Sequence, residues 1–208
     1  MKSPRPHWNQ LSPGQLRVEP WNGSPTVDVS DGLIHDWVAA YFAPGVRAES
    51  VHDVLANYSQ YPKTYAPEVL RAEVLPPSGD EARLLMRMVK KKIITVVLDT
   101  EFQIESLQPS KGVFVSRSRS SRTWEVDDVG KPSETRLAPG TGFGFLWALN
   151  SYWYIEDRDG GAYVECRAIS LTRDIPTGLG WAIKPMITSL PKESLEKTLR
   201  DTVQAATR

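Results

Sequence analysis

The chain of 208 residues carries 25 basic and 25 acidic side chains, three histidines and one cysteine, Cys166. This length suits one domain or one domain plus an arm, the neutral charge balance argues against nucleic acid as the main partner, and one cysteine excludes an intrachain disulfide. So few cysteines and histidines spell out no zinc-type ligand cluster, and we expect no metal or other cofactor.

The N-terminal residues 1–30 are rich in proline and poor in periodic apolar positions, which predicts an irregular arm. They contain no apolar stretch of the signal-peptide type, so the chain as given is expected to be cytoplasmic, and exported if an N-terminal signal was removed. No apolar run reaches the length of a membrane span, so we expect no stable membrane insertion. The sequence defines no oligomeric state.

Residues 31–208 are predicted to form one domain. Residues 32–42 are rich in β-branched and aromatic side chains and predict a strand that ends at the breaker Ala43-Pro44-Gly45. Residues 47–58 then place apolar side chains at helical spacing, which predicts a short amphipathic helix that stops at Pro62.

Four strands are predicted next, at residues 68–75, 81–90, about 94–107 and 113–126. Their apolar and polar side chains alternate, as in half-buried antiparallel strands. In the last of them, Ser118 and its neighbouring serines share one face, and Arg117 and Arg119 share the other. Which face points inward is open: the strand either pairs its arginines with acidic residues of the preceding strand, or supplies polar contacts to a ligand.

Two long strands and a helical tail follow a polar loop at residues 127–142. In the first strand, about 143–156, the odd-numbered residues are expected to face inward. In the second, 162–172, the inward side chains are small, which suits close approach of a helix. The tail has apolar residues at helical spacing and is expected to be kinked or divided by Pro185 and Pro191.

This order predicts an α+β fold in which a curved antiparallel sheet of about seven strands is wrapped around a long C-terminal helix. Two segments, residues 46–62 and 160–172 with Pro176 and Gly178 after them, resemble the START/SRPBCC helix-grip superfamily, which includes pollen-allergen-like and polyketide cyclase-like proteins. Three further segments (Gly32-Leu-Ile-His35-Asp-Trp37, Gly144-Phe-Leu-Trp147 and Tyr152-Trp153) are similar to an uncharacterised bacterial branch. The resemblance implies an apolar cavity between sheet and helix, and it carries over no catalytic residue.

The candidate ligand-binding residues are the side chains expected on the inner face of the sheet and on the tail helix. They are His35, Trp37, Met86, Met88, Phe102, Ser118, Phe145, Trp147, Trp153, Ile183, Met186 and Ile187. Several of them have an alternative reading: Trp37, Phe145, Trp147 and Trp153 as ordinary core packing, Met86 and Met88 as gap filling, and His35 as a hydrogen-bonded core histidine.

Three functions fit these patterns. The first is binding or carrying an apolar small molecule or lipid in an enclosed cavity, which requires no chemistry. The second is an enzyme of the cyclase, aromatase or hydrolase type on the same fold, with His35 as acid or base and Arg117 or Arg119 orienting the substrate. The third is an interaction domain with a solid core. No catalytic residue is assigned, and a binding protein is favoured over an enzyme.

Overall fold

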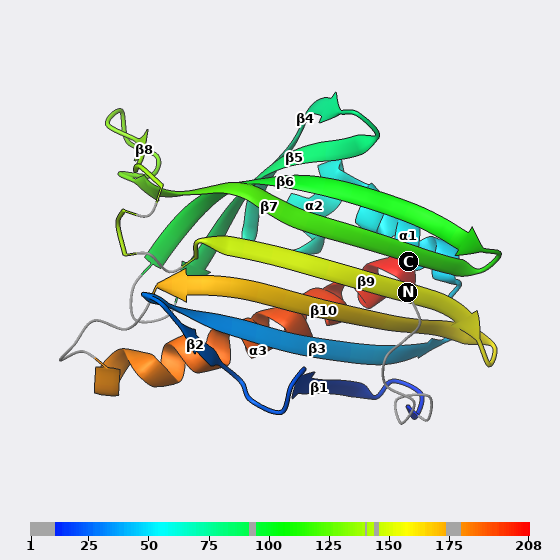
Figure 1. Cartoon of the computed structure of the whole chain (residues 1–208). Helices are drawn as coiled ribbons and strands as arrows, with labels where there is room; N and C mark the ends of the chain where they lie inside the picture. The colour runs from blue at the N-terminus through cyan, green and yellow to red at the C-terminus, as the bar shows by residue number, and fades with distance from the viewer. Residues whose placement is uncertain (1–10, 92–94, 140, 144–145, 174–179) are drawn as a thin grey trace.

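An antiparallel sheet and a long C-terminal helix account for most of the fold (Figure 1). The computed structural model describes residues 11–91, 95–139, 141–143, 146–173 and 180–208, and for residues 180–188 it describes the backbone course but not the side chains. Seven long strands correspond to the seven that the sequence predicts. They are β3 (Gly32–Pro44), β4 (Val69–Ser78), β5 (Glu81–Lys91), β6 (Thr95–Ser110), β7 (Val113–Asp127), β9 (Ala148–Arg158) and β10 (Gly161–Arg173).

Three short strands extend this sheet: β1 (Leu16–Pro20), β2 (Val27–Val29) and β8 (Thr135–Arg136). The order across the sheet is β1-β3-β10-β9-β7-β6-β5-β4, with β2 paired to β3 and β8 paired to β7. Every described pairing is antiparallel, and β3, next to β10, joins the start of the domain to its end.

The predicted N-terminal arm is more ordered than expected over its second half. β1 pairs with β3 from Leu16 opposite Tyr41 to Pro20 opposite Trp37, and β2 pairs with the start of the same strand. The free edge of β3 offers unpaired backbone groups, and these pairings satisfy them. Trp21, which follows β1, packs against an apolar cluster that includes Val38, and the guanidinium of Arg167 lies 4.0 Å from the centre of its ring.

Three helical segments and one long helix cover the inner face. α1 (Ala48–Ala56), η2 (Tyr58–Gln60) and α2 (Tyr61–Thr64) connect β3 to β4. The sequence predicted that Pro62 would end the helical region, and this was wrong. Pro62 occupies the first turn of α2, where its missing N–H costs no helical hydrogen bond. Similarly, Pro185 and Pro191 do not divide the tail, which forms one helix, α3 (Gly180–Ala206).

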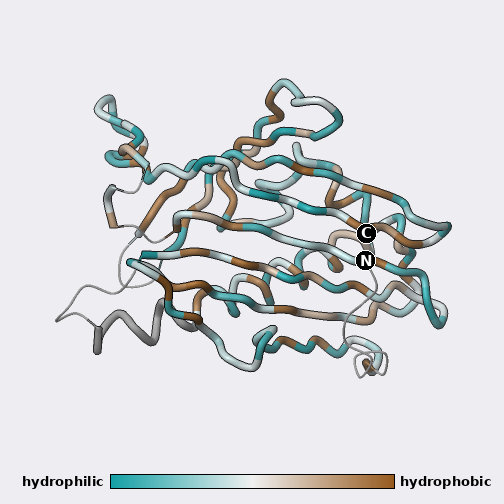
Figure 2. Tube along the Cα trace, viewed as in Figure 1, coloured by the Kyte–Doolittle hydropathy of each residue, from teal (hydrophilic) through white to brown (hydrophobic). Residues whose placement is uncertain are grey.

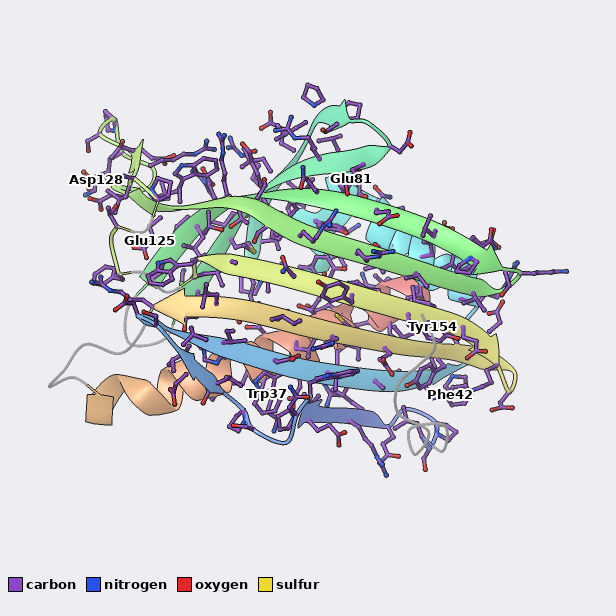
Figure 3. All side chains as sticks on the ribbon, viewed as in Figure 1. Trp37, Phe42, Glu81, Glu125, Asp128 and Tyr154 are labelled. Atoms are coloured by element: carbon purple, nitrogen blue, oxygen red, sulfur yellow. The ribbon has the colours of Figure 1, made fainter. Side chains whose placement is uncertain are left out.

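The main core lies between the sheet and the C-terminal half of α3. Leu195, Leu199 and Val203 of α3 pack against Val51 and Leu55 of α1 and against apolar side chains of β3, β9 and β10. Hydropathy alternates along the strands in Figure 2, as expected where one face is covered and the other meets solvent. Tyr154, an even-numbered residue of β9, lies on the face turned away from α3 (Figure 3).

Candidate functional site

A pocket of about 300 Å³ lies between the inner face of the sheet and the helices α2 and α3. Its walls come from β4, β5, β6, β7, β9 and β10 on one side and from Leu190, Ser194 and Thr198 of α3 on the other. The volume is at the lower end of the range of about 300–1,000 Å³ that is typical of small-molecule sites. Apolar side chains make up most of the lining.

Five of the predicted site residues line this pocket: Met86, Met88, Phe102, Ser118 and Trp153. They come from four different strands, and the register of the sheet brings them together. Phe102 pairs with Leu84, two residues from Met86, and Ser116, two residues from Ser118, pairs with Trp153. The alternation that the sequence shows in each strand therefore places them on one surface.

Three other predicted residues lie beside the pocket and do not line it. His35 and Trp37 are buried side chains of β3. In the sheet, β10 lies between β3 and the strand β9 that lines the pocket. Trp37 belongs to the main core. Trp147 packs near Gly32 at the start of β3, where the ring lies 3.4 Å from the position that a Cβ on Gly32 would occupy. Phe145 and the side chains of Ile183, Met186 and Ile187 lie outside the described residues.

The inward face of β7 is the serine face. Ser116 and Ser118 line the pocket, while Arg117 and Arg119 are exposed and form ion pairs with Glu105 at 3.5 Å and Glu81 at 2.5 Å. Arg117 therefore pairs across the ladder with an acidic residue of β6, and Arg119 with one of β5. In the structure, the arginines that an enzyme mechanism would have used for orienting a substrate are on the solvent side.

Several lining residues were not predicted. Tyr61 of α2 and Tyr65, the residue directly after α2, line the pocket, while their hydroxyls are engaged elsewhere: Tyr61 donates to the Leu55 carbonyl at 2.6 Å, and Tyr65 contacts Thr202 Oγ1 at 3.0 Å. Burial raises the pKa of both phenols, so they stay protonated. Their helical segment carried no apolar periodicity that would have indicated a pocket wall.

Lys90 is the most informative of these residues. The sequence suggests a solvated hairpin tip at Lys90-Lys91-Lys92, yet Lys90 continues the inward series of Leu84, Met86 and Met88 and lines the pocket. Lys90 Nζ contacts Glu68 Oε2 at 2.5 Å and donates to Ser194 Oγ of α3 at 2.7 Å. Strict application of the two-residue period to β5 would have found it.

A second polar group lies at the β10 side of the pocket. Thr172 lines the pocket, and its Oγ1 contacts Nε2 of the buried His35 at 3.0 Å, so His35 helps to hold this part of the pocket wall in place. Burial lowers the pKa of His35, which is therefore neutral near pH 7. Among the described residues, His35 Nδ1 has no hydrogen-bond partner.

The lining offers no assembled reaction centre in the part of the chain that the structure describes. Cys166 lines the pocket as a free thiol, but burial raises its pKa, which keeps it in the unreactive protonated form. No group of three metal-ligating side chains occurs among the described residues. None of the described helices is long and apolar enough to cross a membrane. The arrangement is suited to hold an apolar molecule.

Comparison with known proteins supports the fold and leaves the ligand open. No model of a protein family matches the chain, and no curated protein matches it. Among solved structures, a STAR-related lipid transfer protein from Xanthomonas axonopodis aligns with a TM-score of 0.57 at 14% identity, covering 89% of this chain and 100% of that one.

Two other solved structures are similar. The Zhui aromatase/cyclase from Streptomyces sp. R1128 has a TM-score of 0.55 at 12% identity, with 84% of this chain and 94% of that chain covered. Human STARD10 has a TM-score of 0.51 at 12% identity, with 88% and 71% covered. At such identities the likeness concerns shape alone. The chain thus shares the helix-grip fold of these structures, which confirms the fold predicted from its sequence.

Proposed function

We propose that this protein binds or carries an apolar small molecule or lipid in the pocket between the sheet and α3. The observation that carries the proposal is the pocket itself: a space of about 300 Å³ lined by methionine, leucine and aromatic side chains. Apolar concave sites with a few polar groups are the usual form of small-molecule sites. The helix-grip fold, shared with a protein described as a lipid transfer protein, supports the same reading.

The pocket favours this proposal over an interaction domain with a solid core. The proposal also accounts better for the lining than catalysis does. His35 does not line the pocket, and Arg117 and Arg119 point to solvent.

Binding of the neutral dye N-phenyl-1-naphthylamine tests the proposal. We expect its fluorescence to rise on binding, and we expect native mass spectrometry of freshly purified protein to show an apolar molecule that leaves on denaturation. Ala168→Phe places a bulky ring in the pocket and should weaken dye binding at least about tenfold, because the added ring occupies the site.

The matched control is Leu107→Phe. Leu107 lies on β6 outside the pocket and is 47% exposed, so its variant adds the same ring where it meets solvent. It should bind the dye as the wild type does. Equal affinity in Ala168→Phe and the wild type would contradict the proposed site.

A further inference from the structure

The first observation concerns charge. Among the described residues that line the pocket, Glu68 is the only one with a carboxylate and Lys90 the only one with a basic group. Their side chains contact each other at 2.5 Å. Lys90 also donates to Ser194, so its cationic group already has an anion and a hydroxyl as partners. A ligand carboxylate or phosphate entering this pocket would find no uncompensated cation among the described lining residues, and burying an unpaired anion is strongly unfavourable.

The second observation concerns hydroxyl groups. Ser118 of β7 and Ser151 of β9 lie directly opposite each other in the sheet, and Ser170 lies on β10, one strand beyond β9. All three line the pocket. Within the described part of the chain, none of their hydroxyls makes a hydrogen bond to another residue.

Ser170 is the decisive member of this group, which we term the serine band (Ser118, Ser151 and Ser170). Ser170 is only 8% exposed as a residue, but its hydroxyl oxygen is not among the fully buried unpaired atoms, so the hydroxyl opens onto the pocket that the residue lines. A hydroxyl that opens onto a cavity and has no described protein partner can exchange hydrogen bonds with water or with a ligand oxygen inside that cavity.

The serine band and the ion pair are well separated. Ser118 pairs with Ile104 of β6, whereas Lys90 pairs with Val96, eight residues earlier on that strand. Methionine and leucine side chains of β5 and β6 lie between them. A ligand whose polar end meets the serine band can therefore extend its apolar part along this wall.

We infer that the pocket selects an uncharged amphiphile that carries a hydroxyl or carbonyl oxygen, and that it discriminates against an anionic amphiphile of the same length. The oxygen exchanges hydrogen bonds with the serine band, and the Glu68–Lys90 pair keeps the opposite end of the pocket electrically neutral. This inference rests on the proposed function, because it specifies the ligand chemistry of the same site.

Competition against bound N-phenyl-1-naphthylamine at pH 8 measures this preference. The competitors are 1-decanol, methyl decanoate and decanoate, which share a chain length and differ in charge. We expect the two neutral compounds to displace the dye at concentrations at least about tenfold lower than decanoate does. Ser170→Ala, and separately the double change Ser118→Ala with Ser151→Ala, should weaken 1-decanol about three- to tenfold, the range for a neutral hydrogen bond.

Ser121→Ala is the matched control. Ser121 is an exposed serine of β7 whose hydroxyl donates to the Glu101 carbonyl at 3.4 Å, away from the pocket. This variant should keep the wild-type affinity for 1-decanol. Thermal melting of each variant establishes that it is folded before its affinity is compared.

Glu68→Gln tests the charge argument separately. It keeps the shape of the Glu68 side chain and leaves Lys90 without its anion, so decanoate should bind about three- to tenfold more tightly while 1-decanol is unaffected. Decanoate that competes as well as 1-decanol against the wild type would overturn the inference, as would a Glu68→Gln variant whose preference is unchanged. Absence of dye binding by the wild type would instead refute the proposed function itself.

Discussion

At the level of single residues, the contact between His35 and Thr172 links the pocket wall to the buried interior. His35 is fully buried on β3, and Thr172 on β10 carries the contact to the pocket lining. No described charged group lies within hydrogen-bonding distance of the imidazole to compensate for its lost hydration, so burial lowers the pKa of His35. The folded protein therefore holds this residue neutral at pH values where an exposed histidine is protonated.

This burial makes stability depend on pH. In the unfolded chain His35 takes up a proton near its ordinary pKa of about 6.5, while the folded protein resists protonation until a lower pH. The unfolded state then binds more protons, so the free energy of unfolding should fall as pH drops below about 6.5, by at most about 1.4 kcal/mol per pH unit. Urea titrations at pH 7, 6 and 5 measure this slope.

His35→Gln should remove that part of the slope, because glutamine cannot titrate. The matched variant His52→Gln removes an imidazole from α1, where it stacks on Phe114, and should retain the slope. A His35→Gln protein with the full wild-type slope between pH 7 and 5 would show that another group is responsible.

Residue by residue, the sequence predicts the inner face of the sheet well and the polar parts of the pocket poorly. The two-residue period suffices for Met86, Phe102 and Trp153, because a regular strand fixes the side of each side chain. Such a period cannot reveal that Lys90 meets Glu68 and Ser194, since that contact joins three distant segments. Nor can it separate the lining of a pocket from solid core, as Trp37 shows.

At the level of elements, β8 and the loop before it are bound to the outer face of β5 and β6 by ion pairs. Asp99 of β6 is fully buried there and accepts hydrogen bonds from Arg87 of β5 at 2.7 and 2.9 Å and from Arg136 of β8 at 2.8 Å. Glu134 accepts from Arg87 at 2.7 Å. Burial by itself would raise the pKa of Asp99, but the two arginines outweigh it and lower that pKa below its ordinary value.

Asp99→Asn should therefore destabilise the protein by about 3 kcal/mol at pH 7, because two arginines lose their buried anion. The folded pKa of Asp99 is below the unfolded value of about 3.9, so its contribution is present above about pH 4 and is lost as pH falls through the folded pKa. Urea unfolding at pH 7 and at pH 3 measures both effects, and the difference between wild type and variant should shrink at pH 3.

Glu105→Gln serves as the control for this network. Its partner Arg117 lies at 3.5 Å and is exposed, so the change should alter stability by less than about 1 kcal/mol. An Asp99→Asn protein as stable as Glu105→Gln would contradict the role of the network. The alternation of β6 is enough to put Asp99 on the outer face, but no local pattern indicates that Glu134 and Arg136, more than 30 residues further along the chain, meet Arg87 and Asp99 there.

Some strands could be predicted from their own sequence, whereas others depend on pairing with a distant segment. The long strands were predictable from alternation, whereas β1, β2 and β8 are short and form because a neighbouring strand offers free backbone groups. In β4 a register shift between Val69 and Arg71 turns Leu70 outward, and Val69 lines the pocket. A bulge of this kind leaves no clear signal in the hydrophobic pattern.

At the level of the whole molecule, α3 holds the fold and borders the pocket with different residues. Leu199 and Val203 are buried in the main core with α1, β3 and β10, whereas Leu190, Pro191 and Ser194 border the pocket. Leu195 does both. Stability and binding should therefore respond to different substitutions along one helix, although unfolding of this helix would remove both.

Leu199→Ala tests this separation. Leu199 is fully buried and does not line the pocket, so its truncation leaves a hole in the core and should lower the free energy of unfolding by about 2–5 kcal/mol. Urea unfolding followed by circular dichroism measures the loss. The dye affinity of the folded variant should remain within about twofold of the wild type, since the pocket wall is unchanged.

The control Leu107→Ala, at an exposed site, should change stability by no more than about 0.5 kcal/mol. The pocket-filling variant Ala168→Phe should show the converse, with dye binding lost and cooperative unfolding retained. If Leu199→Ala instead lost dye affinity while still folded, packing in the core would also determine ligand binding. Stability and binding would then not depend on separate residues of α3.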